Sequence, residues 1–392
     1  MSFSAQDEKY MRQALQLARQ GVALASPNPR VGAVVVSNAG DVIGSGFHTY
    51  DGVKHAEVLA LEQAQAQAGG RAKGGTLYLN LEPCSHQGRT GPCCDAVIAA
   101  GISRVVAAMA DPNPQVSGQG FARMRAAGIT VQSGLMETEA RKLNETFAKF
   151  ILTKLPLVTL KSGMTLDGKI AGPQGHSVNA EVHEAGGTIA WVTSKESREH
   201  VQQLRHESDA IMVGVGTVVA DDPLLTDRTG LARRRGLLRV ILDSRLRLPV
   251  NSRVVKTAKN DVVVFCSFVE ENKRRELEAR GVRVEQVALG LSEGRPDMQK
   301  VVARLGELNI TSLLIEGGAL VNWEALATSV ADKVFFYYAP KILGGTGSVP
   351  FASGAGFKQM SEAVVVKNMT LHRFGEDFAM EGYLRDPYAA RD

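Results

Sequence analysis

Three potential metal ligands at the ends of predicted elements place the strongest constraint on this chain. His55 opens a predicted helix, Cys84 follows a predicted strand over 76–82, and Cys93 lies at the start of a predicted helix over 92–100. An imidazole and two thiolates suit zinc, and three protein ligands leave the fourth tetrahedral position open, as in catalytic rather than structural sites. The alternative is that the cysteines are core thiols and His55 a surface residue. All three residues are of types that bind zinc, and each lies at the end of a predicted element. This combination favours a metal site.

Neighbouring residues refine this prediction. Glu57 lies two residues beyond His55, so it could move protons beside the metal without being a ligand. Pro92 is predicted as the first helical residue, which puts Cys93 in the opening turn, where the helix dipole favours a thiolate. Adjacent helical residues point about 100° apart. Cys94 is therefore predicted to be a buried apolar residue rather than a ligand.

Short apolar strands alternate with helical segments, which indicates an α/β layered fold. A helix ends before the Leu155-Pro156 step, so we place a domain boundary near residues 150–156 and expect domains over 1–150 and 151–392. Strands are predicted at 31–36, 42–47, 76–82, 104–109, 129–132, 157–161, 210–215, 237–242, 261–266, 282–287, 311–315, 333–339 and 376–384. Helices are predicted at 4–22, 55–67, 92–100, 119–127, 137–151, 194–207, 270–280, 297–308 and 319–328.

Composition narrows the class of protein. The net charge of +4 over 392 residues is mild and argues for small anionic ligands rather than a nucleic-acid partner. No apolar run approaches the roughly 20 residues of a membrane span, and the first residues have no apolar signal-peptide core. We therefore expect a cytoplasmic protein with no membrane partner. Four cysteines, three of them within residues 84–94, fit metal binding better than a disulfide framework.

The spacing of the cysteines then carries a family resemblance. Zinc deaminases of nucleic acids and nucleosides usually have two residues between the paired cysteines, whereas eight intervene here (SHQGRTGP). The loop PCSHQGRTGPC resembles the RibD family of bifunctional riboflavin-biosynthesis enzymes, as do the stretches PNPRVG from Pro27, GFH from Gly46 and DPNP from Asp111. Gly91 departs from the family, which usually has proline there.

The resemblance implies a cytidine-deaminase-like, three-layer α/β/α first domain. It further implies hydrolytic deamination of 2,5-diamino-6-ribosylamino-4(3H)-pyrimidinone 5′-phosphate, with zinc held by His55, Cys84 and Cys93, and with Glu57 as the catalytic proton carrier. Residues that match the family's substrate pocket are Asn28, His48, His86, Arg89, Asp111 and Asn113. Taken singly, Asn28, Asp111 and Asn113 could simply form turns.

The second half has no G-x-G-x-x-G between a strand and a helix, so a Rossmann site is not indicated. Fragments such as LKSGMTLDG from Leu160, GTVVADDP from Gly216 and Glu316-Gly317-Gly318 are similar to the same family's reductase domain, which implies a dihydrofolate-reductase-like α/β fold and NADPH as cofactor. Gly317 and Gly318 fall between a strand and a helix, where backbone N–H groups could hold a pyrophosphate; the pair could also be only a turn.

The reductase resemblance implies the site residues of this half. The cofactor would be bound by Gly163, Trp191, Thr217, Asp221, Ser244, Gly317 and Gly318. The substrate would be bound by Arg205, Leu225, Arg228 and Glu316. The catalytic candidates for orienting and protonating during reduction of the ribosyl group to 5-amino-6-(5-phosphoribitylamino)uracil are Lys161, Asp221 and Glu316, with no ranking among them.

Two segments of the second half depart from the family pattern or have two interpretations. The segment over 169–190 is longer than the family's usual connection, and Ile189 stands where a substrate-contacting serine is expected. The run over 233–235, three arginines, could reach a cofactor 2′-phosphate, but a solvated loop is the expectation. A nucleic-acid deaminase, a protein with one inactive site and a non-catalytic binding protein are the competing hypotheses. We also expect a homo-oligomer.

Overall fold

The computed structural model describes residues 3–68, 72–173, 191–290 and 294–389. The chain forms two compact units, and neither is continuous in sequence. The first unit comprises Met1–Thr153, Ala232–Arg235 and Tyr388–Asp392, and the second comprises Lys154–Leu231 and Gly236–Pro387. Within the described ranges, no helix combines the length and the apolar character that a bilayer crossing requires.

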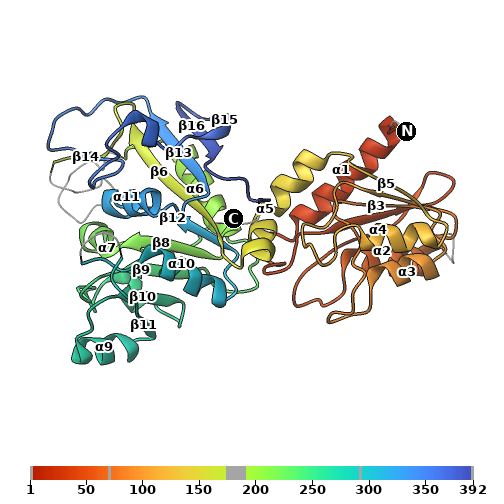
Figure 1. The fold of residues 1–392 in the computed structure, drawn as a ribbon, viewed down its shortest axis with the longest axis horizontal. Helices are drawn as coiled ribbons and strands as arrows, with labels where there is room; N and C mark the ends of the chain where they lie inside the picture. The colour runs from red at the N-terminus through yellow and green to blue at the C-terminus, as the bar shows by residue number, and fades with distance from the viewer. Residues whose placement is uncertain (1–2, 69–71, 174–190, 291–293, 390–392) are drawn as a thin grey trace. The chain divides into compact units, whose positions relative to one another are not determined.

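The first unit is built on a five-stranded sheet with the order β2-β1-β3-β4-β5 (Figure 1). The β1 strand pairs antiparallel with β2 and β3, while β3, β4 and β5 run parallel. The strands are β1 Gly32–Val36, β2 Val42–Phe47, β3 Thr76–Leu79, β4 Arg104–Ala107 and β5 Thr130–Ser133. The helices are α1 Ala5–Arg19, α2 Ala56–Ala68, α3 Cys93–Ala99, α4 Gln119–Ala126 and α5 Glu137–Thr153. Helices α1 and α5 lie on one face and α2, α3 and α4 on the other, which gives the predicted three-layer fold.

Helix α1 shows how local chemistry sets the layers. The Ser4 side chain caps the helix and accepts a hydrogen bond from the Asp7 N–H, and Asp7 in turn accepts from Ser4, which forms a capping box. Met11 and Leu15 are buried on the sheet-facing side. The helix ends at Arg19, three residues before the predicted end. A side chain at Gly32 of β1 would lie 2.2 Å from the Ala14 carbonyl oxygen, so only glycine allows α1 to pack this closely.

The second unit has a nine-stranded sheet with the order β11-β10-β9-β8-β12-β6-β13-β16-β15 (Figure 1). The strands from β11 to β13 in this order run parallel, and β16 runs antiparallel to both of its neighbours, β13 and β15. Its strands are β6 Leu157–Thr165, β8 Ala210–Gly214, β9 Leu238–Leu242, β10 Val262–Cys266, β11 Val282–Gln286, β12 Ser312–Ile315, β13 Lys333–Ala339, β15 Lys367–Phe374 and β16 Asp377–Tyr383. A separate two-stranded sheet pairs β7 Lys169–Ala171 with β14 Val349–Pro350.

Helices cover both faces of this sheet, because successive strand residues point to opposite faces and both faces are apolar. Met212 packs in one core cluster with residues of α10 and α11, while Ile211 and Val213 pack in another that includes Leu277 of α9. The helices are α6 Lys195–Glu207, α7 Val215–Asp221, α8 Arg253–Lys256, α9 Glu271–Glu278, α10 Met298–Glu307 and α11 Ala319–Ala327, with a 3₁₀ turn η1 Met360–Glu362.

Most predicted elements are confirmed to within a few residues, including the strand near 376–384 and the helix over 194–207. Helix α3 begins at Cys93, with Pro92 as its cap rather than its first residue. The sequence did not predict α7, α8, β7, β14 or β15.

Candidate active sites

The three predicted metal ligands converge in the first unit. His55 immediately precedes α2, Cys84 follows β3 at the end of a short extended segment, and Cys93 is the first residue of α3. Their ligand atoms all lie within 4.8 Å of one another, with His55 Nδ1 3.1 Å from Cys93 Sγ and 3.5 Å from Cys84 Sγ. Two sulfurs and one imidazole nitrogen at this separation can surround a single tetrahedral ion and leave one position open.

Cys94 points away from this cluster. Its thiol donates to the Pro83 carbonyl oxygen at 3.4 Å and to the Gly120 carbonyl oxygen at 3.8 Å, and the residue is fully buried. The turn of the helix thus separates two adjacent cysteines. One faces the histidine, and the other fills the core.

Hydrogen bonds among the three candidate ligands shift their pKa values in a way that favours metal binding. Cys84 forms hydrogen bonds with the Cys93 thiol, which has the larger effect, and with the His55 imidazole. These hydrogen bonds lower the pKa of Cys84 to about 4, although burial opposes this. The hydrogen bond to Cys84 also raises the pKa of His55. The cluster therefore holds a thiolate together with protons that a cation can displace, since a thiol deprotonates when it coordinates a metal.

Glu57 lies in the first turn of α2, beside the ligands and almost without solvent exposure. Burial raises the pKa of Glu57 to about 7, against the opposing charge of His55. Among the described residues, its Oε2 atom has no hydrogen-bond partner. A buried carboxyl oxygen without a partner is costly, so this atom suits a donor that arrives with the metal or the substrate.

A shell of polar groups surrounds the ligands. The amide of Asn28 lies 3.0 Å from His48 Nε2, and the His48 ring is perpendicular to the His55 ring at a centroid distance of 5.0 Å. Burial lowers the pKa of His48, and the charges of His55 and Arg89 act in the same direction. Asn28 and His48, both predicted substrate contacts, therefore lie beside the metal ligands.

Asp111 and Asn113 are placed by a residue that the sequence analysis did not single out. Glu82 is buried after β3, and its carboxylate accepts hydrogen bonds from the backbone N–H groups of Asp111, Gly118 and Phe121. Asp111 itself accepts from the Asn113 N–H, which is the turn geometry allowed for in the alternative interpretation. Burial raises the pKa of Asp111 to about 6. A charged residue directly before Pro83, at the end of the predicted strand over 76–82, was the available signal.

His86 and Arg89 lie in the exposed loop between Cys84 and Cys93. The Arg89 guanidinium donates to the Tyr50 carbonyl oxygen at 2.9 Å, and its central carbon lies 4.6 Å from the centroid of the Tyr50 ring. Tyr50 was not predicted as a site residue.

The arginine run over 233–235 is half-buried within the first unit, so it is neither a fully solvated loop nor part of a cofactor pocket in the second unit.

The second unit contains a cavity of about 1120 Å³ at the carboxyl ends of the parallel strands β6, β8, β9 and β12. Ligands of open α/β sheets bind at this edge. All predicted reductase-site residues line the cavity: Lys161, Gly163, Trp191, Arg205, Thr217, Asp221, Leu225, Arg228, Ser244, Glu316, Gly317 and Gly318. Ile189 and most of the long segment lie outside the described residues.

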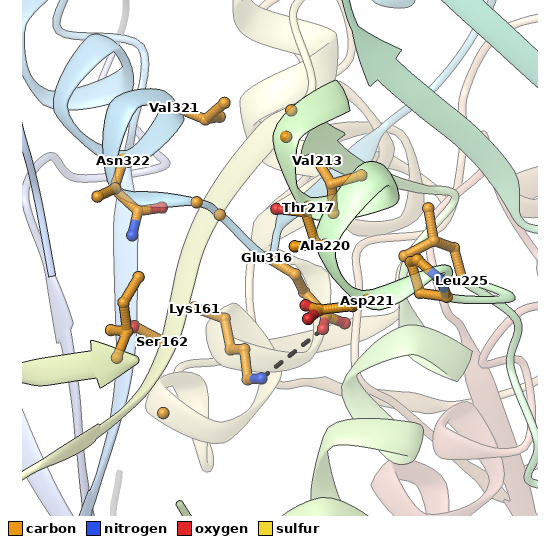
Figure 2. Close-up of a pocket in the computed structure, with 18 of the residues that line it drawn as sticks. Lys161, Ser162, Val213, Thr217, Ala220, Asp221, Leu225, Glu316, Val321 and Asn322 are labelled. Atoms are coloured by element: carbon orange, nitrogen blue, oxygen red, sulfur yellow. Dashed lines mark ion pairs between the residues drawn. The ribbon is translucent and has the colours of Figure 1, made fainter. Parts of the chain in front are cut away.

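A charged cluster forms the floor of this cavity. Glu316, directly after β12, pairs with Arg205 of α6 through contacts of 2.6 and 3.0 Å and with Lys161 of β6 at 3.7 Å. Figure 2 shows the Lys161 ammonium directed toward the Glu316 carboxylate. The charges of Arg205 and Lys161 outweigh burial and lower the pKa of Glu316 to about 2. Burial lowers the pKa of Lys161, and Glu316 opposes that shift.

The glycine pair forms a cradle at the start of α11. Gly317 has φ +91°, and Gly318 has φ +58° with ψ 151°, a region that is essentially restricted to glycine. A side chain at Gly318 would approach Thr217 Oγ1 at 3.3 Å, and one at Gly317 would approach the Asn322 amide at 3.0 Å. Asn322 is a buried lining residue that the sequence analysis missed (Figure 2). The backbone here can approach a phosphate group closely.

Comparisons with known proteins also divide the chain into a deaminase part and a reductase part. Residues 4–109 match the model of the cytidine and deoxycytidylate deaminase zinc-binding region, and residues 156–380 match the RibD C-terminal domain. The chain is 40% identical to the riboflavin biosynthesis protein RibD of Aquifex aeolicus, over 95% of this chain and 97% of that one. It is 38% identical to RibD of Actinobacillus pleuropneumoniae, over 97% and 96%.

Solved structures give the same result. The chain superposes on Acinetobacter baumannii RibD with a TM-score of 0.79 at 34% identity, covering 96% of this chain and 98% of that chain. A diaminohydroxyphosphoribosylaminopyrimidine deaminase / 5-amino-6-(5-phosphoribosylamino)uracil reductase from Thermotoga maritima superposes with a TM-score of 0.79 at 36% identity over the same shares. Likeness over nearly the whole length includes both sites, so this chain belongs to the RibD family of riboflavin biosynthesis, in which a zinc-binding deaminase domain and a reductase domain share one polypeptide.

Proposed function

We propose that the domain over 1–150 deaminates 2,5-diamino-6-ribosylamino-4(3H)-pyrimidinone 5′-phosphate and that the domain over 151–392 reduces the product's ribosyl group with NADPH. The observation that carries the proposal is the presence of two separate clusters of candidate site residues. One gathers His55, Cys84 and Cys93 beside a buried Glu57, and the other gathers Lys161, Arg205 and Glu316 in a large cavity. The name of the Thermotoga maritima relative describes the same pair of reactions.

In the deamination, Glu57 moves the protons. His55, Cys84 and Cys93 would hold the zinc, which when bound would lower the pKa of a water molecule toward about 7. Glu57 takes a proton at Oε2 as the new C–O bond forms at the carbon bearing the 2-amino group. It then gives a proton to the departing nitrogen, so the C–N bond breaks and ammonia leaves. A carboxyl group whose pKa is raised to about 7 suits both transfers. His48 and Asn28 line the substrate side, together with His86, Arg89, Asp111 and Asn113.

In the reduction, the second unit orients the substrate and supplies a proton. When bound, NADPH would supply the hydride that reduces the ribosyl C1′. The residues of the cavity would orient the sugar and place a proton on the ring oxygen that is released as its bond to C1′ breaks. Glu316 stays ionised beside two cations, so it is a poor proton donor. Lys161 carries transferable protons beside it, and we assign Lys161 as the donor. Arg205 holds the substrate, with Leu225 and Arg228, and Asp221 contacts the cofactor.

The preference for NADPH is supported by the cavity wall beyond β9. Ser244 and the guanidinium of Arg247 line it, and the Arg247 side chain is largely exposed and only weakly paired with Asp243, at 3.6 Å. A guanidinium there suits a ribose 2′-phosphate. Arg239, on β9, is buried against Asp261 at 2.8 Å and serves the core.

Incubating the purified full chain with the phosphorylated diaminopyrimidine tests both activities. Without NADPH, we expect ammonia release and accumulation of the deaminated ribosyl compound. With NADPH, we expect the ribityl product, and NADH should give a kcat/KM about ten- to a hundredfold lower because the charge-assisted phosphate contact is lost. Ammonia release is measured in a coupled assay and cofactor oxidation by absorbance. Equal kcat/KM for the two cofactors contradicts the preference, and absence of ammonia contradicts the deaminase assignment.

We also propose a homo-oligomer in the cytoplasm. Strand β15 forms one edge of the nine-stranded sheet and exposes apolar side chains, with Met369 62% and Leu371 65% exposed. Unpaired edges with apolar side chains favour pairing with another chain. The free thiols of the metal cluster suit a reducing compartment. Sedimentation at micromolar concentration should give a mass above that of one chain, and Leu371→Lys should lower that mass. A wild-type monomer contradicts the proposal.

A further inference from the structure

Four residues from the second half of the sequence belong to the first unit. Ala232–Arg235 follow Leu231 and precede β9, yet they pack with the deaminase fold. The Arg234 backbone N–H donates to the Ala23 carbonyl oxygen at 3.0 Å, and the Arg235 guanidinium donates to Ser26 Oγ at 3.2 Å. These contacts fix the segment beside the loop that carries Asn28.

Arg234 brings a second guanidinium to the ring of Tyr50. Its central carbon lies 4.1 Å from the ring centroid, and that of Arg89 lies 4.6 Å from the same centroid. Two cations at one ring repel each other. The nearest carboxylate contact of Arg234 is to Asp51 at 3.8 Å, and the Asp51 side chain is 71% exposed, so it offsets little of that repulsion.

Arg234 nevertheless loses much of its hydration. Its side chain is only 20% exposed, and its buried Nε has no hydrogen-bond partner among the described residues. Burying a guanidinium without full pairing is costly. Two arginines at one ring, one of them with a buried Nε that lacks a partner among the described residues, suit the binding of a phosphate, because each planar guanidinium can offer two parallel N–H groups.

The partners of Arg234 belong to segments of the candidate metal site. Tyr50 follows His48 by two residues, and its backbone N–H is held by the Leu24 carbonyl oxygen at 3.0 Å. Arg89 lies on the loop between Cys84 and Cys93, and donates to the Tyr50 carbonyl oxygen. The segments that carry Arg89 and Tyr50 are therefore the same segments that carry Cys84, Cys93 and His48, and Arg234 lies against the ring of that Tyr50.

We propose that Arg234 is a substrate-binding residue of the deaminase and that it holds the 5′-phosphate together with Arg89. The inference rests on the proposed deaminase function and extends it. The stack on Tyr50 orients both guanidinium groups before the substrate arrives, so less side-chain entropy is lost on binding. The reductase half of the sequence thus contributes a residue to the deaminase site.

The test uses the full-length chain with Arg234→Ala and Arg234→Lys, and two substrates, the pyrimidine ribonucleotide and its phosphate-free ribonucleoside. Arg141→Ala is the matched control, because Arg141 also lies over a tyrosine ring in the first unit, 3.8 Å from the centroid of Tyr388. Arg234→Ala should raise KM for the phosphorylated substrate roughly 10- to 100-fold, with little change in kcat. The phosphate-free substrate should show no difference. Arg234→Lys should give a smaller increase in KM, and Arg141→Ala none.

Each outcome separates the inference from the function on which it rests. A wild-type protein that does not deaminate the phosphorylated substrate refutes the proposed function. Active wild type with Arg234→Ala behaving like Arg141→Ala overturns the inference alone. Equal losses on both substrates would mean that Arg234 only packs Tyr50, which also overturns it. Zinc content and reductase activity report folding, and if Arg234→Ala does not fold, a phosphate-dependent rise in KM for Arg234→Lys decides the matter.

Discussion

Glu57→Gln is expected to lower deaminase turnover by roughly 10²- to 10⁴-fold while zinc remains bound. Glutamine keeps the size and buried position of Glu57 but cannot accept or return a proton, and the ligands themselves are unchanged. Steady-state ammonia release gives the turnover, and elemental analysis gives the zinc content. Reductase activity on the deaminated substrate should be unaffected, because its residues lie in the second unit. Deamination close to the wild-type rate would exclude Glu57 as the proton carrier.

The two adjacent cysteines provide matched controls for that experiment. Cys93→Ser should lose zinc and deaminase activity together, since Cys93 Sγ lies 3.1 Å from the His55 ring nitrogen. Cys94→Ser should retain both, because the Cys94 thiol hydrogen-bonds to backbone carbonyl groups instead. Loss of zinc from the Cys94 variant alone would overturn the ligand assignment.

Glu316→Gln should abolish most reductase activity and destabilise the second unit by about 3–5 kcal/mol. The substitution leaves Arg205 and Lys161 buried without their shared carboxylate. Removing the negative charge also lowers the pKa of Lys161 further. Because Lys161 donates only while it is protonated, activity should fall as pH rises through its pKa, and this fall should occur at lower pH in the variant. Chemical denaturation and the pH profile of residual kcat/KM measure the two effects.

A second buried ion pair in the same unit provides a control that distinguishes an effect on stability from an effect on catalysis. Glu381 pairs with Lys333 at 2.8 Å, and neither residue lines the cavity. Glu381→Gln should therefore destabilise the unit without moving the pH profile of reduction. If both variants shift the profile equally, or if Glu316→Gln leaves it unchanged, Glu316 does not control Lys161.

Local patterns predicted the parts of the fold that local chemistry determines. The Ser4 cap and the following apolar residues located α1, and the proline before Cys93 located the start of α3. The three candidate zinc ligands come together in the structure because each lies at an element end, where backbone direction is constrained.

The elements that the sequence missed depend on tertiary contacts. Helix α7, Val215–Asp221, contains β-branched valine and threonine residues and an internal glycine, all of which disfavour a helix locally. Strand β15 is an exposed edge whose side chains show no alternation of burial, so its only strong determinant is pairing with β16. Glu82 and Asn322 acquire their positions from partners distant in the sequence.

The contribution of Arg234 could not be predicted from the arginine run itself. Three consecutive arginines are typical of a solvated loop. What distinguishes Arg234 is the ring of Tyr50, which lies far away in the sequence and becomes its neighbour only in the folded first unit.

The discontinuity of the first unit has a consequence for synthesis on the ribosome. Its sheet and helices are complete once Thr153 has emerged, and N-terminal domains generally fold as they appear. Arg234 and Tyr388, whose hydroxyl donates to the Arg141 carbonyl oxygen, are translated later. At translation rates of about 5–20 residues per second, the last of these contacts forms roughly ten to fifty seconds after the core. A nascent chain arrested before Arg234 therefore has the metal ligands and Glu57 in place, but not the second arginine at Tyr50.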